Sequence, residues 1–356
     1  MKVFNSLDEI TGTESCALAL GNFDGVHKGH QALIAKAVRA AKKQGMKSGV
    51  FTFSNHPKGL MPGCKEFKNI IYSEEKEALI AQLGVDYLFN IEFNEAIMTM
   101  PPADFTQKLL VDKFKAREIF CGFNYRFGFK AAGNVSFLRT EGKKLGFKVN
   151  VMEPVSVDGE VVSSTLIRSL IKSGDVDECY KYLGRNYDIG GEVVVGNRLG
   201  KSLGFPTSNI MIDENMVTPP NGVYITYCIY NGKKYPSVTN VGVKPTIGSY
   251  KKNVETHIFN FNKELYGKYI KVEFLKMTRD EVKFNDIRSF SGLDCDFEYF
   301  ELENSEIEVL EETKKHTDYM VFEKKDENGN DLKEIDWEHT KAIANRGNHI
   351  YINLKG

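Results

Sequence analysis

Residues 18–30 read LALGNFDGVHKGH, an apolar strand that breaks into a glycine-rich turn and opens a helix near His30. In such a turn the backbone N–H groups approach a phosphate, and the N-terminus of the following helix adds a favourable dipole. His27 and His30 can then donate hydrogen bonds to the phosphates of a nucleotide. A lone histidine beside a glycine is more often an ordinary loop residue. The whole string, however, predicts a phosphate-binding strand, turn and helix.

The first half of the chain alternates short apolar runs with stretches of helical character. Five runs read as buried strands: 16–20, 49–53, 87–93, 118–122 and 147–152. Helices are predicted over 31–44, after an N-cap at Ser73, and over 165–183 with an interruption at Gly174. This order predicts an α/β fold with a doubly wound parallel sheet, right-handed crossovers and a ligand crevice at the carboxyl ends of its strands.

Beyond residue 185 the pattern changes to β-rich runs that are separated by Gly, Pro and Asn turns, without intervening helices. The predicted strands are 190–196, 222–230, 234–239, 254–261 and 269–277. They indicate an antiparallel barrel or sandwich of about 110 to 120 residues. We therefore expect one domain at 1–184 and a second at 185–300.

Charge narrows the classes of partner. The 356 residues contain 47 Lys and Arg against 48 Asp and Glu, so no global positive field attracts nucleic acid or anionic lipid. Residues 301–356 hold 14 acidic and 8 basic residues and read as a partly ordered acidic extension of unknown role. The remaining 300 residues carry a formal charge of +5, which suits phosphorylated ligands.

The sequence also bears on the compartment. No apolar run approaches the roughly 18 residues of a membrane span, and residues 1–13 carry acidic residues where a signal peptide has its apolar region. The six cysteines are spread singly, with no C-x-x-C pair for zinc or redox chemistry. We expect a cytoplasmic protein, a monomer or weak homo-oligomer, with no membrane or nucleic-acid partner.

A second glycine-rich stretch lies in the β-rich half, where residues 196–209 read GNRLGKSLGFPTSN. Thr207 and Asn209 are two residues apart, so their side chains share one face if the segment is extended. Hydroxyl and amide oxygens are hard ligands that suit Mg²⁺ shared with ATP phosphates. By itself, a stretch of this composition is usually only a loop.

The first motif resembles the nucleotidyltransferase module of the prokaryotic bifunctional riboflavin kinase/FAD synthetase family, whose pattern G-N-F-D-G-V-H-x-G-H matches residues 21–30 in full. Three further stretches resemble the same module: FTFSNHP at 51–57, CGFNYRFG at 121–128 and VSSTLIR at 162–168. The resemblance implies transfer of an adenylyl group from ATP to FMN, with release of pyrophosphate. This chemistry needs positioning and charge neutralisation rather than a covalent protein nucleophile.

The same resemblance assigns residue roles in this module. His27, His30 and Arg168 would be catalytic. ATP and phosphate contacts would come from Gly21, Asn22, Phe23, Asp24, Gly25, Gly29, Asn124, Ser164 and Thr165. The flavin would be bound by Phe53, Asn55, Tyr125 and Phe127. Taken alone, each aromatic is more often a core residue, and residues 163–168 are more often a helix N-cap followed by a surface arginine.

The second stretch resembles the riboflavin kinase signature G-x-x-x-G-x-x-L-G-F-P-T-A-N, followed in family order by NVGVKPT at 240–246 and VETHIFNF at 254–261. Phosphate contacts would come from Gly196, Gly200, Lys201 and Gly204, and flavin contact from Arg279. Thr207 and Asn209 would hold Mg²⁺. Glu255 would be the base that takes the proton of the riboflavin 5′-hydroxyl, although a single strand glutamate is more often only solvent-facing.

The two resemblances together imply a bifunctional enzyme with ATP, riboflavin and FMN as substrates. Its fold would join the α/β nucleotidyltransferase domain to an antiparallel β-barrel riboflavin kinase domain. Two alternatives stay open at this point: a riboflavin kinase whose first module is inactive, and a flavin-binding regulatory protein. FMN accumulating without FAD would indicate the former, and tight flavin binding without turnover the latter.

Overall fold

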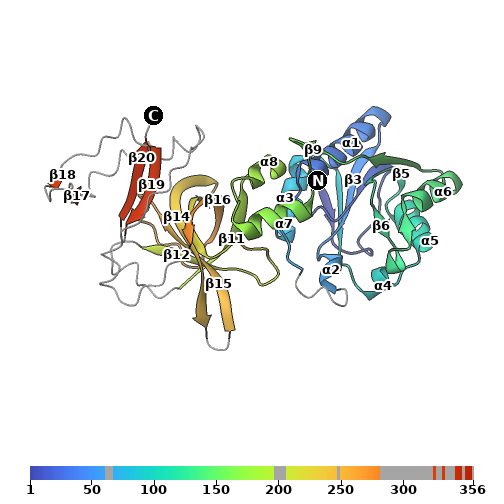
Figure 1. The fold of residues 1–356 in the computed structure, drawn as a ribbon. Helices are drawn as coiled ribbons and strands as arrows, with labels where there is room; N and C mark the ends of the chain where they lie inside the picture. Colours follow the sequence, from blue (N-terminus) through green and yellow to red (C-terminus); the bar gives the residue numbers. More distant parts are fainter. Residues whose placement is uncertain are drawn as a thin grey trace. The chain divides into compact units, whose positions relative to one another are not determined.

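The computed structural model describes residues 1–60, 67–195, 206–246 and 249–280, and four short strands between 324 and 354. The chain forms two compact units (Figure 1). Unit 1 comprises Met1–Lys172, Glu178–Arg185 and Asp213–Thr218, and unit 2 comprises Ser173–Asp177, Asn186–Ile212 and Pro219–Gly356. The segment Asp213–Thr218 thus packs in unit 1, although it lies within the range 185–300 predicted for the second domain.

Unit 1 is built on a six-stranded sheet in the order β1-β4-β3-β2-β5-β8, and every neighbouring pair is parallel. The strands are β1 (Lys2–Phe4), β2 (Cys16–Leu20), β3 (Lys47–Phe53), β4 (Tyr87–Ile91), β5 (Ala116–Gly122) and β8 (Lys148–Met152). The five predicted strands are confirmed, and β1 at the edge is an addition. The strand order reverses at β2, which places the switch point of the sheet at the glycine-rich turn.

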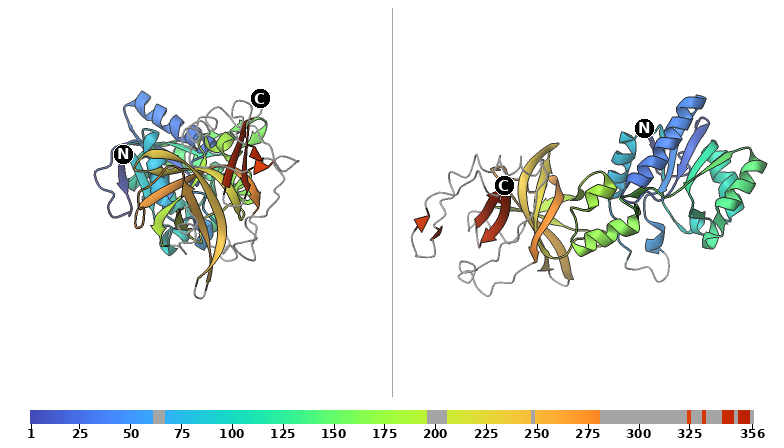
Figure 2. Two further views of the ribbon diagram at one scale, coloured as in Figure 1. Left: turned by 90° about the vertical axis from the view of Figure 1, so that its left-hand side faces the viewer. Right: turned by 45° about the horizontal axis from the view of Figure 1, so that its top comes forward.

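Helices cover both faces of this sheet (Figure 2). The helices of this part of the chain are α1 (Lys28–Gln44), α2 (Pro57–Leu60), α3 (Ser73–Gln82), α4 (Glu95–Met98), α5 (Pro102–Asp104), the π-helix η1 (Phe105–Lys113), α6 (Val135–Leu145), α7 (Ser164–Ser173) and α8 (Cys179–Leu183). Shorter elements complete the unit: β6 (Arg126–Phe127), the 3₁₀ turn η2 (Phe129–Ala131), β7 (Gly133–Asn134), β9 (Ser156–Val157) and β10 (Glu160–Val161).

The core of unit 1 lies between the sheet and its helices. Strand β2 is buried along its whole length, and aromatic rings such as Phe51, Phe89 and Phe114 pack against one another. The N-cap predicted at Ser73 is wrong, because Tyr72 holds that position, and its side chain does not cap the helix. The hydroxyl of Ser73 instead accepts a hydrogen bond from the buried amide of Asn90 at 3.1 Å.

Unit 2 contains a closed six-stranded barrel in the order β11-β12-β15-β14-β13-β16, with antiparallel pairing throughout. Its strands are β11 (Tyr187–Val194), β12 (Thr207–Met211), β13 (Gly222–Tyr230), β14 (Lys233–Thr246), β15 (Ser249–Ile258) and β16 (Tyr269–Asp280). The prediction of a barrel is confirmed. Strand β12 is an addition, in a stretch that the sequence presents mainly as a loop.

The barrel interior combines apolar residues with a chain of buried hydroxyls. Thr226 contacts Ser237 and Thr239 at 2.8 Å each, and Thr239 contacts Thr256 at 2.9 Å. All four side chains are buried, so each hydroxyl that leaves water finds a partner. This network ties β13, β14 and β15 together from inside.

The acidic extension is described only at two pairs of antiparallel strands: β17 (Lys324–Lys325) with β18 (Asp331–Leu332), and β19 (Lys341–Arg346) with β20 (His349–Leu354). The rest of 301–356 lies outside the described residues. Of the six cysteines, Cys16, Cys121, Cys179 and Cys228 are described, and each is a buried free thiol.

Candidate active sites

The turn after β2 has the tight geometry that its glycines predict. Gly25 has a φ of +86°, in the left-handed region, and a Cβ there would lie 3.1 Å from Cδ1 of Ile70. The buried hydroxyl of Thr52 donates to the backbone oxygen of Asn22 at 2.9 Å, which fixes the turn on β3. The backbone of the turn is therefore held at the carboxyl edge of the sheet.

Both predicted histidines lie at the start of α1, which begins at Lys28, earlier than expected. His27 is the N-cap, and its Nδ1 accepts a hydrogen bond from the backbone N–H of His30 at 3.3 Å. The two imidazole rings stack with centroids 3.6 Å apart. A Cβ at Gly29 would lie 3.2 Å from the ring of His27, so this glycine makes room for the stack.

Burial keeps both imidazoles neutral. It lowers the pKa of His27 to about 4, and it holds the pKa of His30 well below its usual range, with His27 adding to the effect. Because Nδ1 of His27 accepts a hydrogen bond, the neutral ring carries its proton on Nε2 and can donate there. Nδ1 of His30 is buried and has no hydrogen-bond partner among the described residues.

The pKa of His27 makes the stability of unit 1 depend on pH. Unfolded histidine binds a proton below pH 6.5, whereas folded His27 does so only near pH 4, so this contribution is complete above pH 6.5 and is lost as the pH falls to 4. The full loss is about 3 kcal/mol. We expect urea unfolding of His27→Asn, which keeps a capping acceptor, to show a shallower pH dependence over this range. If the free energy of unfolding depended on pH equally in the unsubstituted protein and in His27→Asn, a neutral His27 would be contradicted.

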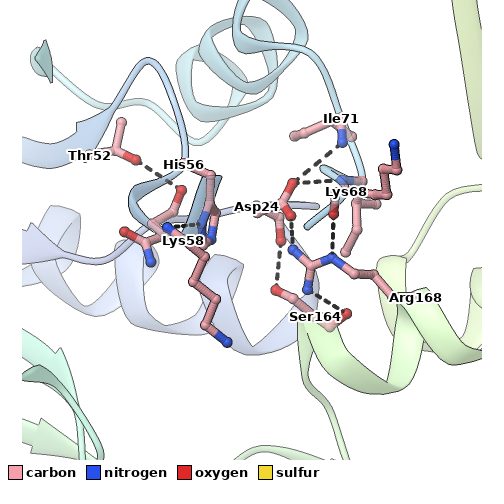
Figure 3. Close-up of polar contacts among 10 residues, drawn as sticks. Asp24, Thr52, His56, Lys58, Lys68, Ile71, Ser164 and Arg168 are labelled. Carbon is pink, nitrogen blue, oxygen red and sulfur yellow. Dashed lines mark hydrogen bonds and ion pairs between the residues drawn. The ribbon is translucent and has the colours of Figure 1, made fainter. Parts of the chain in front are cut away.

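Asp24 and Arg168 form a buried ion pair (Figure 3), although the sequence assigns them to phosphate binding and catalysis. The carboxylate also accepts hydrogen bonds from the backbone N–H groups of Ile70, at 2.9 Å, and Ile71, at 3.4 Å. The guanidinium donates to Lys68 O at 2.7 Å and to Ser164 O at 3.1 Å. These donors hold the Asp24 carboxylate in the turn, and its contact with phosphate stays a prediction.

The residues that precede Arg168 in the VSSTLIR stretch have different surroundings. The hydroxyl of Ser164 donates to the backbone oxygen of Asp24 at 2.8 Å, and that of Ser163 caps α7 through the N–H of Leu166 at 3.2 Å. Thr165 is exposed. The N-cap interpretation is confirmed, whereas the surface arginine is not, since the side chain of Arg168 is only 15% exposed.

Breaking this pair should destabilise unit 1. Asp24→Asn keeps an acceptor for the two amides but leaves Arg168 uncompensated, and we expect a loss of about 3–5 kcal/mol in the free energy of unfolding. Asp104→Asn is the matched control, because it breaks an exposed pair with Lys108 and should cost at most about 1 kcal/mol. Denaturant unfolding measures both, and equal effects would contradict a buried, structural pair.

A cavity of about 430 Å³ lies in unit 1 beside α3; we call it the α3 cavity. Four predicted residues are among those that line it: Asn22, Asp24, Phe53 and Asn55. His27, His30 and Arg168 are not part of this lining. Of the predicted flavin residues, Asn55 forms two hydrogen bonds with the backbone of Phe93. Its Oδ1 accepts from the N–H of Phe93 at 2.7 Å, and its Nδ2 donates to the oxygen of Phe93 at 3.0 Å.

The remaining residues predicted near the flavin lie elsewhere in unit 1. Phe127 belongs to the core, where its ring packs against Phe105 at 5.0 Å, and Tyr125 stacks on it at 5.8 Å. Asn124 is exposed in the turn after β5. None of these three lines the α3 cavity.

The structure adds residues to the cavity that the sequence did not reveal. Lys76 is buried in its wall, yet it sits in the stretch SEEKE, which reads as a solvated helix face. His56, within the family-like FTFSNHP, lines the cavity and stacks on Phe67 at 4.0 Å. Residues of 213–216 also contribute to the lining, and no local signal announces a contact this distant in sequence.

The predicted residues of the second site meet on the barrel of unit 2. The hydroxyl of Thr207 donates to Oε1 of Glu255 at 2.6 Å, and Asn209 faces Glu255 in the register of β12 and β15. Asn253 donates its amide to Oδ1 of Asn209 at 3.0 Å. The extended geometry expected for Thr207 and Asn209 is confirmed, since both lie in β12.

The other predicted residues of this site are less closely defined. Arg279 lies near the end of β16, opposite Val223 of β13, and its guanidinium donates to Asp280 O at 3.1 Å. The predicted phosphate contacts, Gly196, Gly200, Lys201 and Gly204, lie outside the described residues.

Comparisons with known proteins cover both units. A family model for FAD synthetase matches residues 9–166, and one for riboflavin kinase matches residues 183–293. The chain is similar to the bifunctional riboflavin kinase/FMN adenylyltransferase of Bacillus subtilis (strain 168), with 34% identity over 282 residues, 77% of this chain and 87% of that protein. The enzyme of the same name from Pseudomonas fluorescens is 33% identical over 281 residues, 77% and 88% of the two chains.

A solved structure shows similarity in three dimensions. The crystal structure described as a macrolide-efflux protein from Streptococcus pneumoniae matches with a TM-score of 0.72 and 28% identity, covering 90% of this chain and 99% of that chain. No helix in the described part of our chain is long and apolar enough to cross a membrane.

The matched family models decide between the interpretations that the sequence left open. Both activities are represented, and the relatives are named for both, which supports neither a kinase with an inactive first module nor a regulatory protein. The chain belongs to the bifunctional riboflavin kinase/FMN adenylyltransferase family, and it uses ATP both to phosphorylate riboflavin to FMN and to adenylylate FMN to FAD.

Proposed function

We propose that adenylylation of FMN takes place in unit 1, within 1–184, and that phosphorylation of riboflavin takes place on the barrel, within 185–300. The observation that carries this assignment is that each unit has its own constellation of groups. Unit 1 places two neutral imidazoles at the N-terminus of α1. The barrel places a carboxylate beside a hydroxyl and an amide.

In the first reaction an oxygen of the FMN phosphate attacks the α-phosphorus of ATP, the bond to the β-phosphate oxygen breaks, and pyrophosphate leaves. The N–H groups at the start of α1 and the Nε2–H of His27 are donors for phosphate oxygens. His30, with its Nδ1 unpartnered in the described structure, completes the pair. Arg168 acts through Asp24, which it holds against the turn, and is therefore a positioning residue.

In the second reaction Glu255 takes the proton of the 5′-hydroxyl of riboflavin as that oxygen attacks the γ-phosphorus of ATP and ADP leaves. The hydrogen bond from Thr207 at 2.6 Å orients the carboxylate. A strand residue is held more rigidly than a loop residue, which favours an accurately placed base.

Thr207 and Asn209 are the residues that we propose as Mg²⁺ ligands. Their oxygens fit this hard cation, because they lie on one face of β12 next to the carboxylate of Glu255. Asn253 orients the amide oxygen of Asn209. When bound, Mg²⁺ neutralises charge on the phosphates of ATP. Among the described residues no group of three His, Cys, Asp or Glu is placed to hold a metal, so the described side chains offer this hydroxyl and amide site instead.

The free thiols of the described cysteines are compatible with a reducing compartment, and we propose that the protein acts in the cytoplasm, as a monomer or weak homo-oligomer. The site assignment is tested by chromatography of the products formed from riboflavin or FMN with ATP and Mg²⁺. Variants of His30 and Glu255 should each remove one product only. Loss of both products in either variant, with the fold intact, would overturn the assignment.

A further inference from the structure

Lys76 is a buried lysine in the wall of the α3 cavity. It lies on α3 and is only 7% exposed, whereas lysine is almost never buried without a partner. Lys76 points into the protein from α3, whereas Glu74 and Glu75 lie in the first turn of this helix, where negative charge interacts favourably with the helix dipole. A cation in this position needs a compensating anion.

The hydrogen bonds of Lys76 leave part of its donor capacity unused. Nζ donates to the backbone oxygen of Phe53, at the carboxyl end of β3. An ammonium group has three donors, and the described structure gives this one no second hydrogen bond. A ligand in the cavity with anionic oxygens would satisfy the remaining donors.

The neighbouring carboxylates are already engaged. Asp24 is paired with Arg168 and accepts two backbone N–H groups. Glu77 accepts a hydrogen bond from the amide of Asn90 at 2.7 Å. Both favour the protonated amine through space, but neither makes a hydrogen bond to it among the described residues.

The other titratable groups around Lys76 are two exposed carboxylates of the cavity lining, Glu74 and Asp213, one arginine and two histidines. Arg168 carries a positive charge, and burial keeps His30 and His56 neutral by lowering their pKa values. Burial lowers the pKa of Lys76 to about 8, so the amine is mostly protonated at neutral pH. Of the charged side chains that line the cavity, Lys76 and Asp24 are buried, whereas Glu74 and Asp213 are exposed. Because Asp24 is already paired with Arg168, an anion in the cavity would give Lys76 a partner of its own.

We propose that Lys76 binds the 5′-phosphate of FMN and holds it for attack on ATP. This inference rests on the proposed placement of FMN adenylylation in unit 1. The position of Lys76 favours the phosphate of FMN over those of ATP, because its one side-chain hydrogen bond within the described structure is to the backbone oxygen of Phe53, a predicted flavin wall on β3. The phosphates of ATP, in contrast, are expected at the N-terminus of α1, where His27 and His30 lie.

The first test is a split between the two substrates. Lys76→Met removes the charge at similar length, and we expect the KM for FMN in FAD formation to rise about 10- to 100-fold while the KM for ATP stays the same. Lys58→Met is the matched control, because Lys58 lies on α2 beside the cavity without lining it. Lys58→Met should leave both KM values unchanged. Thermal unfolding should give both variants the melting temperature of the unsubstituted protein.

The second test is the pH profile, which a merely structural lysine would not change. The FMN phosphate is already dianionic above about pH 6. The KM for FMN should therefore be constant up to about pH 8 and rise at higher pH, as Lys76 loses its proton. Lys76→Arg keeps its charge and should remove this rise.

Three results would overturn the proposal, and they have different meanings. A rise in the KM for ATP instead of FMN would assign Lys76 to the phosphates of ATP. Unchanged KM values with a lower melting temperature would make the lysine structural. Unchanged KM values with an intact fold would show that the phosphate of FMN does not bind in the α3 cavity. The His30→Ala variant then tests separately whether adenylylation takes place in unit 1, because it should lose FAD formation in that case.

Discussion

His30→Ala is expected to lower the rate of FAD formation from FMN and ATP about 10² to 10³-fold, which nearly abolishes this activity, while FMN formation from riboflavin continues unchanged. The imidazole of His30 lies in the first turn of α1, stacked on His27, and its buried Nδ1 has no partner among the described residues. Its removal takes away a group that is oriented before substrate binds. Separate assays with FMN and with riboflavin measure the two activities.

A second variant separates hydrogen bonding from packing. His30→Phe keeps an aromatic ring against His27 and Phe23, whose ring lies 5.1 Å from that of His30, but it has no nitrogen. If His30 acts on phosphate, the phenylalanine variant is as inactive as the alanine variant. Recovery of FAD formation in His30→Phe would show that the ring only packs.

Glu255→Gln is expected to have the reverse effect: FMN formation falls about 10² to 10⁴-fold, and FAD formation from supplied FMN is retained. Glutamine keeps an oxygen for the hydrogen bond from Thr207, so the geometry of β12 and β15 is preserved. Only the ability to take up a proton is lost. The rate of FMN appearance at saturating riboflavin and ATP measures the effect.

Glu192→Gln provides the comparison that this prediction needs. Glu192 is an exposed carboxylate on strand β11 of the same barrel, opposite Tyr269, and we assign it no role in either site. Its substitution should leave FMN formation within a factor of about two, as expected for a surface change. Similar rates for Glu192→Gln and Glu255→Gln would show that Glu255 is only another solvent-facing strand residue.

Much of the fold could be predicted because hydrophobic patterning reports local structure. The buried strands of unit 1 are continuous apolar runs, and α1 ends at Gly45, which adopts the left-handed conformation of a C-cap. Strand β1, with three residues and one buried side chain, is too short for such a signal. The cap at Ser73 failed because the hydroxyl found a tertiary partner, Asn90, instead of the helix backbone.

In the candidate sites, too, some features could be predicted from local sequence and others needed the tertiary structure. Thr207 and Asn209 could be placed on one face from their spacing alone, because alternation along a strand is a local property. Their meeting with Glu255 needed the register of β12 and β15, which joins residues more than forty positions apart. The resemblance assigned Arg168 to catalysis, and its pairing with the buried Asp24 of a distant turn could be seen only in the tertiary structure.

The sequence by itself determined the alternation of elements, the glycine-rich turn before α1 and the two signature stretches, because each depends on residues that are close along the chain. Only the tertiary structure decided which groups meet: Asp24 with Arg168, Thr207 with Glu255, and Lys76 with the α3 cavity. Burial of a charge and the partner that compensates it depend on packing between distant segments, and no local pattern encodes them.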